Sequence, residues 1–251
     1  MEVWLGIYFT MIGLCFGSFF HVVGLRMPKY EKYGISRSRC PACRIQLRWT
    51  ELIPVLSFIL QKGNCKNCHH PIPISYPFIE LLTGTLFLMS YIKIGLHVEL
   101  VTALLLISML IIVFVSDITY MIIPNRLLLF FLPLLIGVRI IQPLHPWWSS
   151  IIGSLLGFGT LYIIILVSRG GMGAGDMKLF GVLGIVLGVQ KVLLAFFLAC
   201  FLGALFGGLL IISKNKSRKH VIPFGPFIVF ASIISYFYGQ NIVDWYVGLL
   251  Y

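Results

Sequence analysis

Two acidic residues, Asp117 and Asp176, lie at the edges of long apolar segments of this chain. A carboxylate costs about 2.5–3.5 kcal/mol at the centre of a membrane-spanning helix, so an acid beside such a segment is a candidate functional residue. Two acids of this kind can share one proton across a substrate. The ionised member then activates water and the neutral member protonates a carbonyl group. The pair therefore predicts hydrolysis by two carboxyl groups.

The residues around Asp176 leave two interpretations open. Gly173 and Gly175 come just before this acid, so Asp176 could be a helix N-cap whose glycines shape the turn. Glycines there would equally let an extended peptide approach the backbone closely. Capping does not explain Asp117, which ends an apolar segment where the helix dipole disfavours an anion. We expect Gly173, Gly175 and Lys178 to support the loop that holds Asp176.

Four cysteines form a second group, as Cys40-Pro-Ala-Cys43 and Cys65-Lys-Asn-Cys68. Two Cys-x-x-Cys pairs at this separation are typical of a tetrahedral Zn²⁺ site, which is coordinatively closed and structural. A redox dithiol and free thiols are the alternatives, although disulfides are rare in a reducing compartment. We expect zinc to hold this polar stretch folded. His69 and His70 could be spare ligands or ordinary polar loop residues.

Composition indicates where these groups are placed. The chain has 251 residues, of which 59% are hydrophobic and only 11% charged, and its mean hydropathy is +0.99. Such a chain is a polytopic membrane protein. We predict an all-α fold of about eight transmembrane helices with one zinc-stabilised cytoplasmic loop.

The apolar segments set the predicted organisation. Residues 1–25 form the first transmembrane helix, 26–75 the four-Cys cytoplasmic loop, and 76–251 a seven-helix membrane core. The predicted spans are Val3–Leu25, Pro77–Ile92, Leu100–Ser116, Arg126–Ile141, Trp148–Ser168, Met177–Val189, Val192–Ile212 and Val221–Tyr238. Cys15 and Cys200 fall within these spans and are expected to be small packing residues.

The distribution of Lys and Arg predicts the orientation. Residues 26–75 and the cluster Lys214–Lys219 are the most basic parts of the chain, and the positive-inside rule places both in the cytoplasm. With eight spans the two placements agree, both termini lie outside, and Asp117 and Asp176 share the cytoplasmic side. The formal net charge of +11 is then explained by topology and the anionic inner leaflet, so no nucleic-acid partner is expected.

Several sequence motifs occur together in this chain. They are Gly173-Ala-Gly175-Asp176-Met-Lys178, Asp117 with Ile123-Pro124-Asn125, Gly17-Ser18-Phe19-Phe20-His21 through Arg26-Met27-Pro28, the two Cys-x-x-Cys pairs, Leu52-Ile-Pro54, and Tyr76-Pro77-Phe-Ile-Glu80. Together these motifs resemble those of the bacterial type IV prepilin peptidase family of membrane aspartyl proteases. The resemblance covers nearly the whole chain. One departure is His21, where the family signature usually has Asn.

The resemblance implies a bifunctional enzyme of the bacterial cytoplasmic membrane. Its members cleave the leader of type IV prepilins or pseudopilins on the cytoplasmic face, with Asp117 and Asp176 here as the catalytic pair. They then N-methylate the new N-terminus with S-adenosylmethionine, an activity associated with the cysteine-containing loop. No nucleotide-binding motif locates the cofactor. Glu80 is our candidate for that site, and the alternative is a polar anchor at a helix end.

Two other classes of protein fit parts of the pattern. A transporter or channel with a zinc-stabilised cytoplasmic domain would use the acids as an ion path, but it predicts them near mid-membrane, not at one edge. A methyltransferase or assembly scaffold would not need a carboxylate pair. Pilus, secretion and competence systems are all compatible with the sequence.

Overall fold

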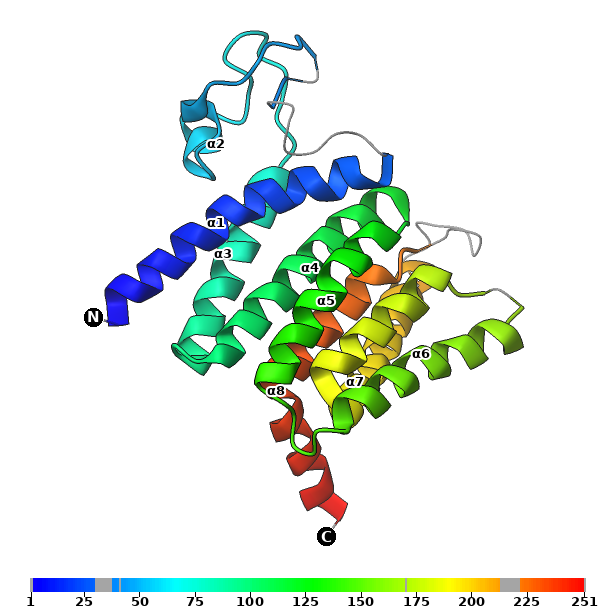
Figure 1. Cartoon of the computed structure of the whole chain (residues 1–251). Coiled ribbons are helices and arrows are strands. Elements are labelled where there is room, and N and C mark those ends of the chain that lie inside the picture. Colours follow the sequence, from blue (N-terminus) through cyan, green and yellow to red (C-terminus); the bar gives the residue numbers. More distant parts are fainter. Residues whose placement is uncertain (1, 30–37, 41, 170, 213–221, 251) are drawn as a thin grey trace. The chain divides into compact units, whose positions relative to one another are not determined.

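The computed structural model is built from helices (Figure 1). It describes residues 2–29, 38–40, 42–169, 171–212 and 222–250, and within these ranges it contains no β-strand. The α-helices are α1 (Glu2–Arg26), α2 (Leu56–Leu60), α3 (Ser75–Ile94), α4 (Val98–Tyr120), α5 (Asn125–Ile141), α6 (Ser149–Val167), α7 (Ala174–Ile212) and α8 (Gly225–Leu250). Short 3₁₀ helices cover Met27–Lys29 and Trp49–Glu51. The predicted all-α class is confirmed.

Within the described ranges, six helices are long and apolar enough to cross a membrane, namely α1, α3, α4, α6, α7 and α8. Helix α5 has 17 residues and so spans about 25 Å, slightly less than the ~30 Å hydrocarbon core. Its buried residues Leu127, Phe131, Leu135 and Arg139 recur every four positions and form one inward face.

Helix α7 folds back on itself at Gly188. This residue has φ 72° and ψ −176° in the middle of the element, a left-handed backbone conformation that glycine adopts without steric cost. The rings of Phe180 and Phe196 are 5.9 Å apart, whereas a straight helix would separate them by about 24 Å. Two antiparallel segments therefore correspond to the predicted spans Met177–Val189 and Val192–Ile212 (Figure 1).

Side chains from other helices satisfy backbone groups that the break at Gly188 exposes. Arg139 donates through Nη2 to the carbonyl oxygen of Val186 at 2.8 Å. The N–H of Val189 donates to the hydroxyl of Ser149 at 3.1 Å. Helix ends leave such groups without intrahelical partners, and leaving them buried and unpaired costs free energy. Arg139 is thus a structural residue of the fold-back.

Two helix ends differ from the sequence prediction. Helix α4 continues past Ser116 to Tyr120, so Asp117 lies within its last turn instead of following the helix. Helix α8 runs to Leu250, well beyond the predicted end at Tyr238. Polar residues on its last turns hydrogen-bond within the helix, as Gln240 does to Asp244 at 2.9 Å, and so the helix continues where the apolar pattern ends.

The chain divides into two compact units, Met1–Val115 and Ser116–Tyr251. In the first, α1 packs along α3 (Figure 1). A Cβ atom at Gly13 would lie 2.8 Å from the Cα of Gly84, and one at Gly17 would lie 2.9 Å from the Cα of Glu80. Small residues four apart permit this close approach of two membrane helices. The packing brings Glu80 against α1.

The second unit contains the end of α4 and helices α5 to α8. Helix α7 packs against α5, α6 and α8. The contact with α6 depends on glycines, because a Cβ at Gly157 would lie 2.5 Å from the carbonyl oxygen of Phe180. Helix α7 is therefore the central element of this unit. It begins two residues before Asp176, so its packing fixes the position of this acid.

Candidate functional site

Asp117 is held at the junction of two helices of the second unit. It is only 5% exposed, and its Oδ2 accepts the backbone N–H of Gly225 at 2.8 Å. Gly225 is the first residue of α8, so the positive end of that helix dipole faces the carboxylate. The C-terminal turn of α4 disfavours an anion at this position, and the N-terminus of α8 offsets that cost. The sequence predicted a helix in this region but not its contact with Asp117.

Asp176 lies in the first turn of α7 and is 8% exposed. Its carboxylate accepts a hydrogen bond from the backbone N–H of Gly173, and its own N–H donates to the carbonyl oxygen of Gly173 at 3.1 Å. Asp176 is thus not the N-cap residue itself. It lies three residues after Gly173 and reaches back to it, as the acidic member of a capping box does.

The structure brings the two acids together. Their carboxyl groups are close enough for the charge on Asp117 to act on Asp176. Both are buried, and neither hydrogen-bonds a basic side chain among the described residues. A buried pair of carboxyl groups without a cation is costly when both are ionised, so such a pair favours a state in which only one of the two is ionised.

Residues on either side of Asp176 contact the segment that joins α4 and α5. A Cβ on Gly175 would lie 3.1 Å from the Cβ of Ile123, so glycine lets the chain pass close to the segment between α4 and α5. Lys178 donates through Nζ to Oδ1 of Asn125 at 3.1 Å. These contacts tie the start of α7 to the start of α5. The structure therefore places Gly175 and Lys178 where they can hold the loop before Asp176.

Gly225 is the site residue that sequence reasoning missed. A Cβ at this position would lie 2.5 Å from Oδ2 of Asp117, so only glycine fits. The sequence signal is Gly225-Pro226 at the start of an apolar segment, since proline is favoured in the first turn of a helix. That signal locates the helix start. It carries no information on the contact with Asp117, which is 108 residues away along the chain.

The four cysteines converge in the first unit. Their sulfur atoms all lie within 4.8 Å of one another, and the Sγ atoms of Cys40 and Cys68 are 3.7 Å apart. A tetrahedral zinc site with Zn–S bonds of about 2.3 Å requires sulfur separations of about 3.8 Å. The residues present therefore fit a four-thiolate zinc ion. His69 and His70 are exposed and are not part of the cluster.

The two cysteine pairs are built in the same way. The N–H of Cys40 donates to the carbonyl oxygen of Ile45, and the N–H of Cys65 donates to that of His70. In each loop the residue after the second cysteine, Arg44 or His69, has a positive φ. The shared geometry is that of two metal-binding knuckles.

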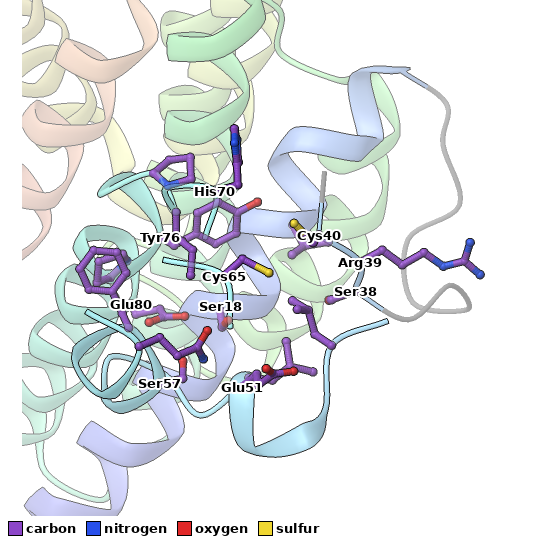
Figure 2. Close-up of a pocket in the computed structure, with 18 of the residues that line it drawn as sticks. Ser18, Ser38, Arg39, Cys40, Glu51, Ser57, Cys65, His70, Tyr76 and Glu80 are labelled. Atoms are coloured by element: carbon purple, nitrogen blue, oxygen red, sulfur yellow. The ribbon is translucent and has the colours of Figure 1, made fainter. Parts of the chain in front are cut away.

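Glu80 lies on α3 at the base of a cavity below the cysteine cluster (Figure 2). Its side chain is 6% exposed, and Oε2 accepts the backbone N–H of Val55 at 2.7 Å. Ser18 of α1 makes a second hydrogen bond to this carboxylate. Glu80 thereby connects α1, α3 and the loop.

His21 and the two remaining cysteines lie outside both candidate sites. His21 is 3% exposed and its ring lies 4.1 Å from that of Tyr76, which indicates a packing contact between α1 and α3. Cys200 is partly buried. Cys15 is exposed on α1, so it is not the interior packing residue that the sequence predicted.

Comparison with known proteins gives a consistent result along the whole chain. The Bacterial Peptidase A24 N-terminal domain matches residues 11–94, and the Type IV leader peptidase family matches residues 104–208. A Bacillus subtilis (strain 168) protein named "Prepilin leader peptidase/N-methyltransferase" is 44% identical over 95% of this chain and 96% of its own length. The chain belongs to the type IV leader peptidase family.

More distant members of the family carry the same name. A protein of Aeromonas salmonicida (strain A449) is 31% identical over 97% of this chain and 95% of its own length. One from Myxococcus xanthus (strain DK1622) is 33% identical over 84% of this chain and 64% of its own length. No solved structure matches the chain. The resemblance to this family is therefore confirmed, and two of these relatives match over at least 95% of their own length.

Proposed function

We propose that the protein cleaves the leader peptide of type IV prepilins or pseudopilins and N-methylates the new N-terminus. The observation that carries the peptidase activity is the buried pair Asp117 and Asp176, brought from α4 and α7 to one place without a cation among the described residues. Membership of the leader peptidase family supports the substrate class.

The proposed hydrolysis uses one proton shared by the two acids. The ionised carboxyl group takes a proton from water, and the water oxygen attacks the carbonyl carbon of the scissile peptide bond. The protonated carboxyl group donates its proton to the carbonyl oxygen. In the collapse of the tetrahedral intermediate the C–N bond breaks, and the acid that took the proton from water gives it to the leaving nitrogen, which becomes the new N-terminal amine. The other carboxylate takes a proton from a hydroxyl group of the intermediate, so the pair again holds one proton. Burial of both acids supports this role because it excludes bulk water from the pair.

Substitution of each acid by asparagine tests the proposal. Asn keeps the shape of Asp but can neither take up nor give a proton, so D117N and D176N should each lose most of the leader cleavage, by about a hundredfold or more. The double variant should be scarcely worse, because residues that act as one unit are not additive. The measurement is cleavage of a purified prepilin by enzyme in lipid nanodiscs.

Controls separate catalysis from capping. Asp244 is exposed near the end of α8, so D244N should cleave at the wild-type rate. The amide oxygen of Asn can still accept the backbone N–H of Gly173, so a purely structural Asp176 would tolerate the change. Near wild-type cleavage by D176N would reject the catalytic pair.

The cleavage rate of the wild-type enzyme should show a bell-shaped dependence on pH. When both carboxyl groups are protonated the pair has no base, and when both are ionised it has no acid, so the rate should fall on either side of the optimum.

We propose S-adenosylmethionine as the methyl donor for the second activity. When bound, this sulfonium compound supplies a methyl group, whose carbon–sulfur bond breaks as a bond to the substrate amine forms. The name shared by the relatives, which includes N-methyltransferase, supports this assignment. Incubation of cleaved pilin with enzyme and S-adenosylmethionine should add the mass of one methyl group to its N-terminal peptide. Absence of that mass would reject the methyltransferase activity.

The zinc ion is proposed as a structural component of the loop. Four thiolates would fill its coordination sphere and leave no open position for a substrate. The active site is proposed to face the cytoplasm of a multi-pass bacterial membrane protein, because the positive-inside rule places both acids and the loop on that side.

A further inference from the structure

We infer that the four-Cys loop docks onto the surface of a bilayer that contains anionic lipid. The docking surface is apolar and consists of Trp49, Leu56, Ile59 and Leu60, whose side chains are between 57% and 78% exposed. The last three belong to α2, and their spacing places them on one face of that helix. Trp49 begins the 3₁₀ helix that packs against α2. Exposed apolar side chains gathered in this way indicate a binding surface.

The position of α2 along α3 identifies the bilayer as the partner. The backbone N–H of Val55, the N-cap residue of α2, donates to Oε2 of Glu80 at 2.7 Å. Helix α3 is a membrane span that begins at Ser75, five residues before Glu80, so the hydrogen bond holds the start of α2 about 7.5 Å along this helix. Amphipathic helices on a membrane lie about 5–10 Å deep in the boundary between headgroups and acyl chains. Helix α2 is therefore held at the depth of such helices.

The side chains around this contact separate the docking surface from the cavity. Phe78 and Leu81 come from the same turns of α3 as Glu80 and are about half exposed, and apolar side chains on the outside of a membrane span face lipid. Ser57 and Phe58 of α2 line the cavity, whereas no residue of the docking surface does. The exposed face of α2 thus continues a lipid-facing surface and is not part of the cavity wall.

Charge favours anionic lipid as the component that is bound. Between residues 38 and 74 the sequence has five Lys or Arg residues and one acid, Glu51. Arg48 and Lys62 flank the docking surface in the sequence, and both are exposed. Basic side chains beside an apolar face attract the phosphate groups of anionic lipids, and tryptophan is enriched at the level of the headgroups. An anionic bilayer matches the apolar side chains, the tryptophan and the flanking cations together.

Photo-cross-linking of the full-length protein tests the inference in vesicles of phosphatidylglycerol and phosphatidylcholine. With p-benzoylphenylalanine in place of Leu60, ultraviolet light should produce lipid adducts at this position. Lys66 is also exposed, but it lies between two cysteines of the cluster and not on α2. The same replacement at Lys66 is the matched control and should give about fivefold less lipid adduct. The metal content of both variants should equal that of the wild type, which shows that the loop is folded.

A second comparison tests the role of charge. R48Q combined with K62Q should lower the lipid adduct at position 60 about fivefold in the anionic vesicles. In vesicles of phosphatidylcholine alone, the same pair of substitutions should leave the adduct unchanged. An equal adduct with and without the two substitutions in anionic vesicles would overturn the assignment of anionic lipid.

Other occupants of the docking surface would give different products. Absence of lipid adducts at position 60, with cross-links to residues 98–250 of the same chain or to a second copy, would overturn the inference. Equal lipid adducts at positions 60 and 66 would overturn it too. Added prepilin should leave the lipid adduct unchanged, and a prepilin adduct in its place would show that the surface binds substrate and not lipid.

Discussion

At the scale of single residues, the position of Asp117 depends on a glycine. Oδ2 of Asp117 accepts the N–H of Gly225, and a Cβ at Gly225 would fall 2.5 Å from the same oxygen. The carboxyl group of Asp117 thus occupies the space that a side chain at position 225 would need. Asp117 lies in the last turn of α4, so a shift of its carboxyl group to make room would change its position relative to Asp176.

We predict that G225A lowers leader cleavage by about a hundredfold, because a misplacement of about 1 Å can cost this much in rate. Gly248 lies on the same helix with no atom within 4 Å of the position of its Cβ. G248A is therefore the matched control and should cleave normally. Cleavage kinetics with a saturating prepilin would measure the loss. Unchanged kinetics in G225A would mean that Asp117 can shift without consequence, which contradicts its role in the pair.

At the scale of elements, hydropathy predicted the spans because each is an apolar run of suitable length. The helix ends were less predictable. Helix α4 continues through Asp117 until Met121, whose positive φ of 55° ends it. Helix α8 continues through the polar residues Gln240 and Asp244, whose side chains hydrogen-bond to each other. Local backbone geometry and side-chain hydrogen bonds determine where α4 and α8 end. Hydropathy averaged along the sequence contains neither kind of information.

The candidate sites were also predictable only in part. The type and spacing of the cysteines predicted their cluster, because two short loops with equal geometry need only be brought together. The environment of the acids was not predictable. Gly225 contacts Asp117 although the two residues are 108 positions apart in the sequence. No local sequence pattern predicts such a contact.

The four-Cys loop should depend on zinc more than the helices do. We predict near-stoichiometric zinc in the wild-type protein and its loss in the double variant with C40S and C65S, because metal binding and folding of this segment are coupled. Limited proteolysis should then cut residues 38–74 faster while the helices stay resistant. Elemental analysis measures the metal.

The matched control for this experiment replaces the two cysteines outside the cluster. C15S and C200S leave the four sulfur ligands in place, so zinc content should not change. Full zinc retention by the double variant of Cys40 and Cys65 would contradict the proposed site.

At the scale of the whole molecule, one orientation has to serve both activities. The leader peptide, the acids and the cysteine loop must share one side of the membrane if cleavage and methylation act in sequence on the same N-terminus. The distribution of positive charge predicts this side to be the cytoplasm. The basic cluster Lys214–Lys219, on which the prediction partly depends, lies outside the described residues.

Labelling with a membrane-impermeant thiol reagent tests the orientation. Trp147, in the turn before α6, is 66% exposed, and W147C should label in intact cells because this turn is predicted to face out. Ser149, the first residue of α6, is a poorer reporter because its hydroxyl accepts the N–H of Val189. T50C in the exposed part of the cysteine loop and S217C should label only after the cells are opened. A background with C15S and C200S removes the other reactive thiols of the spans. Labelling of T50C but not W147C in intact cells would place both candidate sites outside, where a prepilin leader held in the cytoplasm could not reach them.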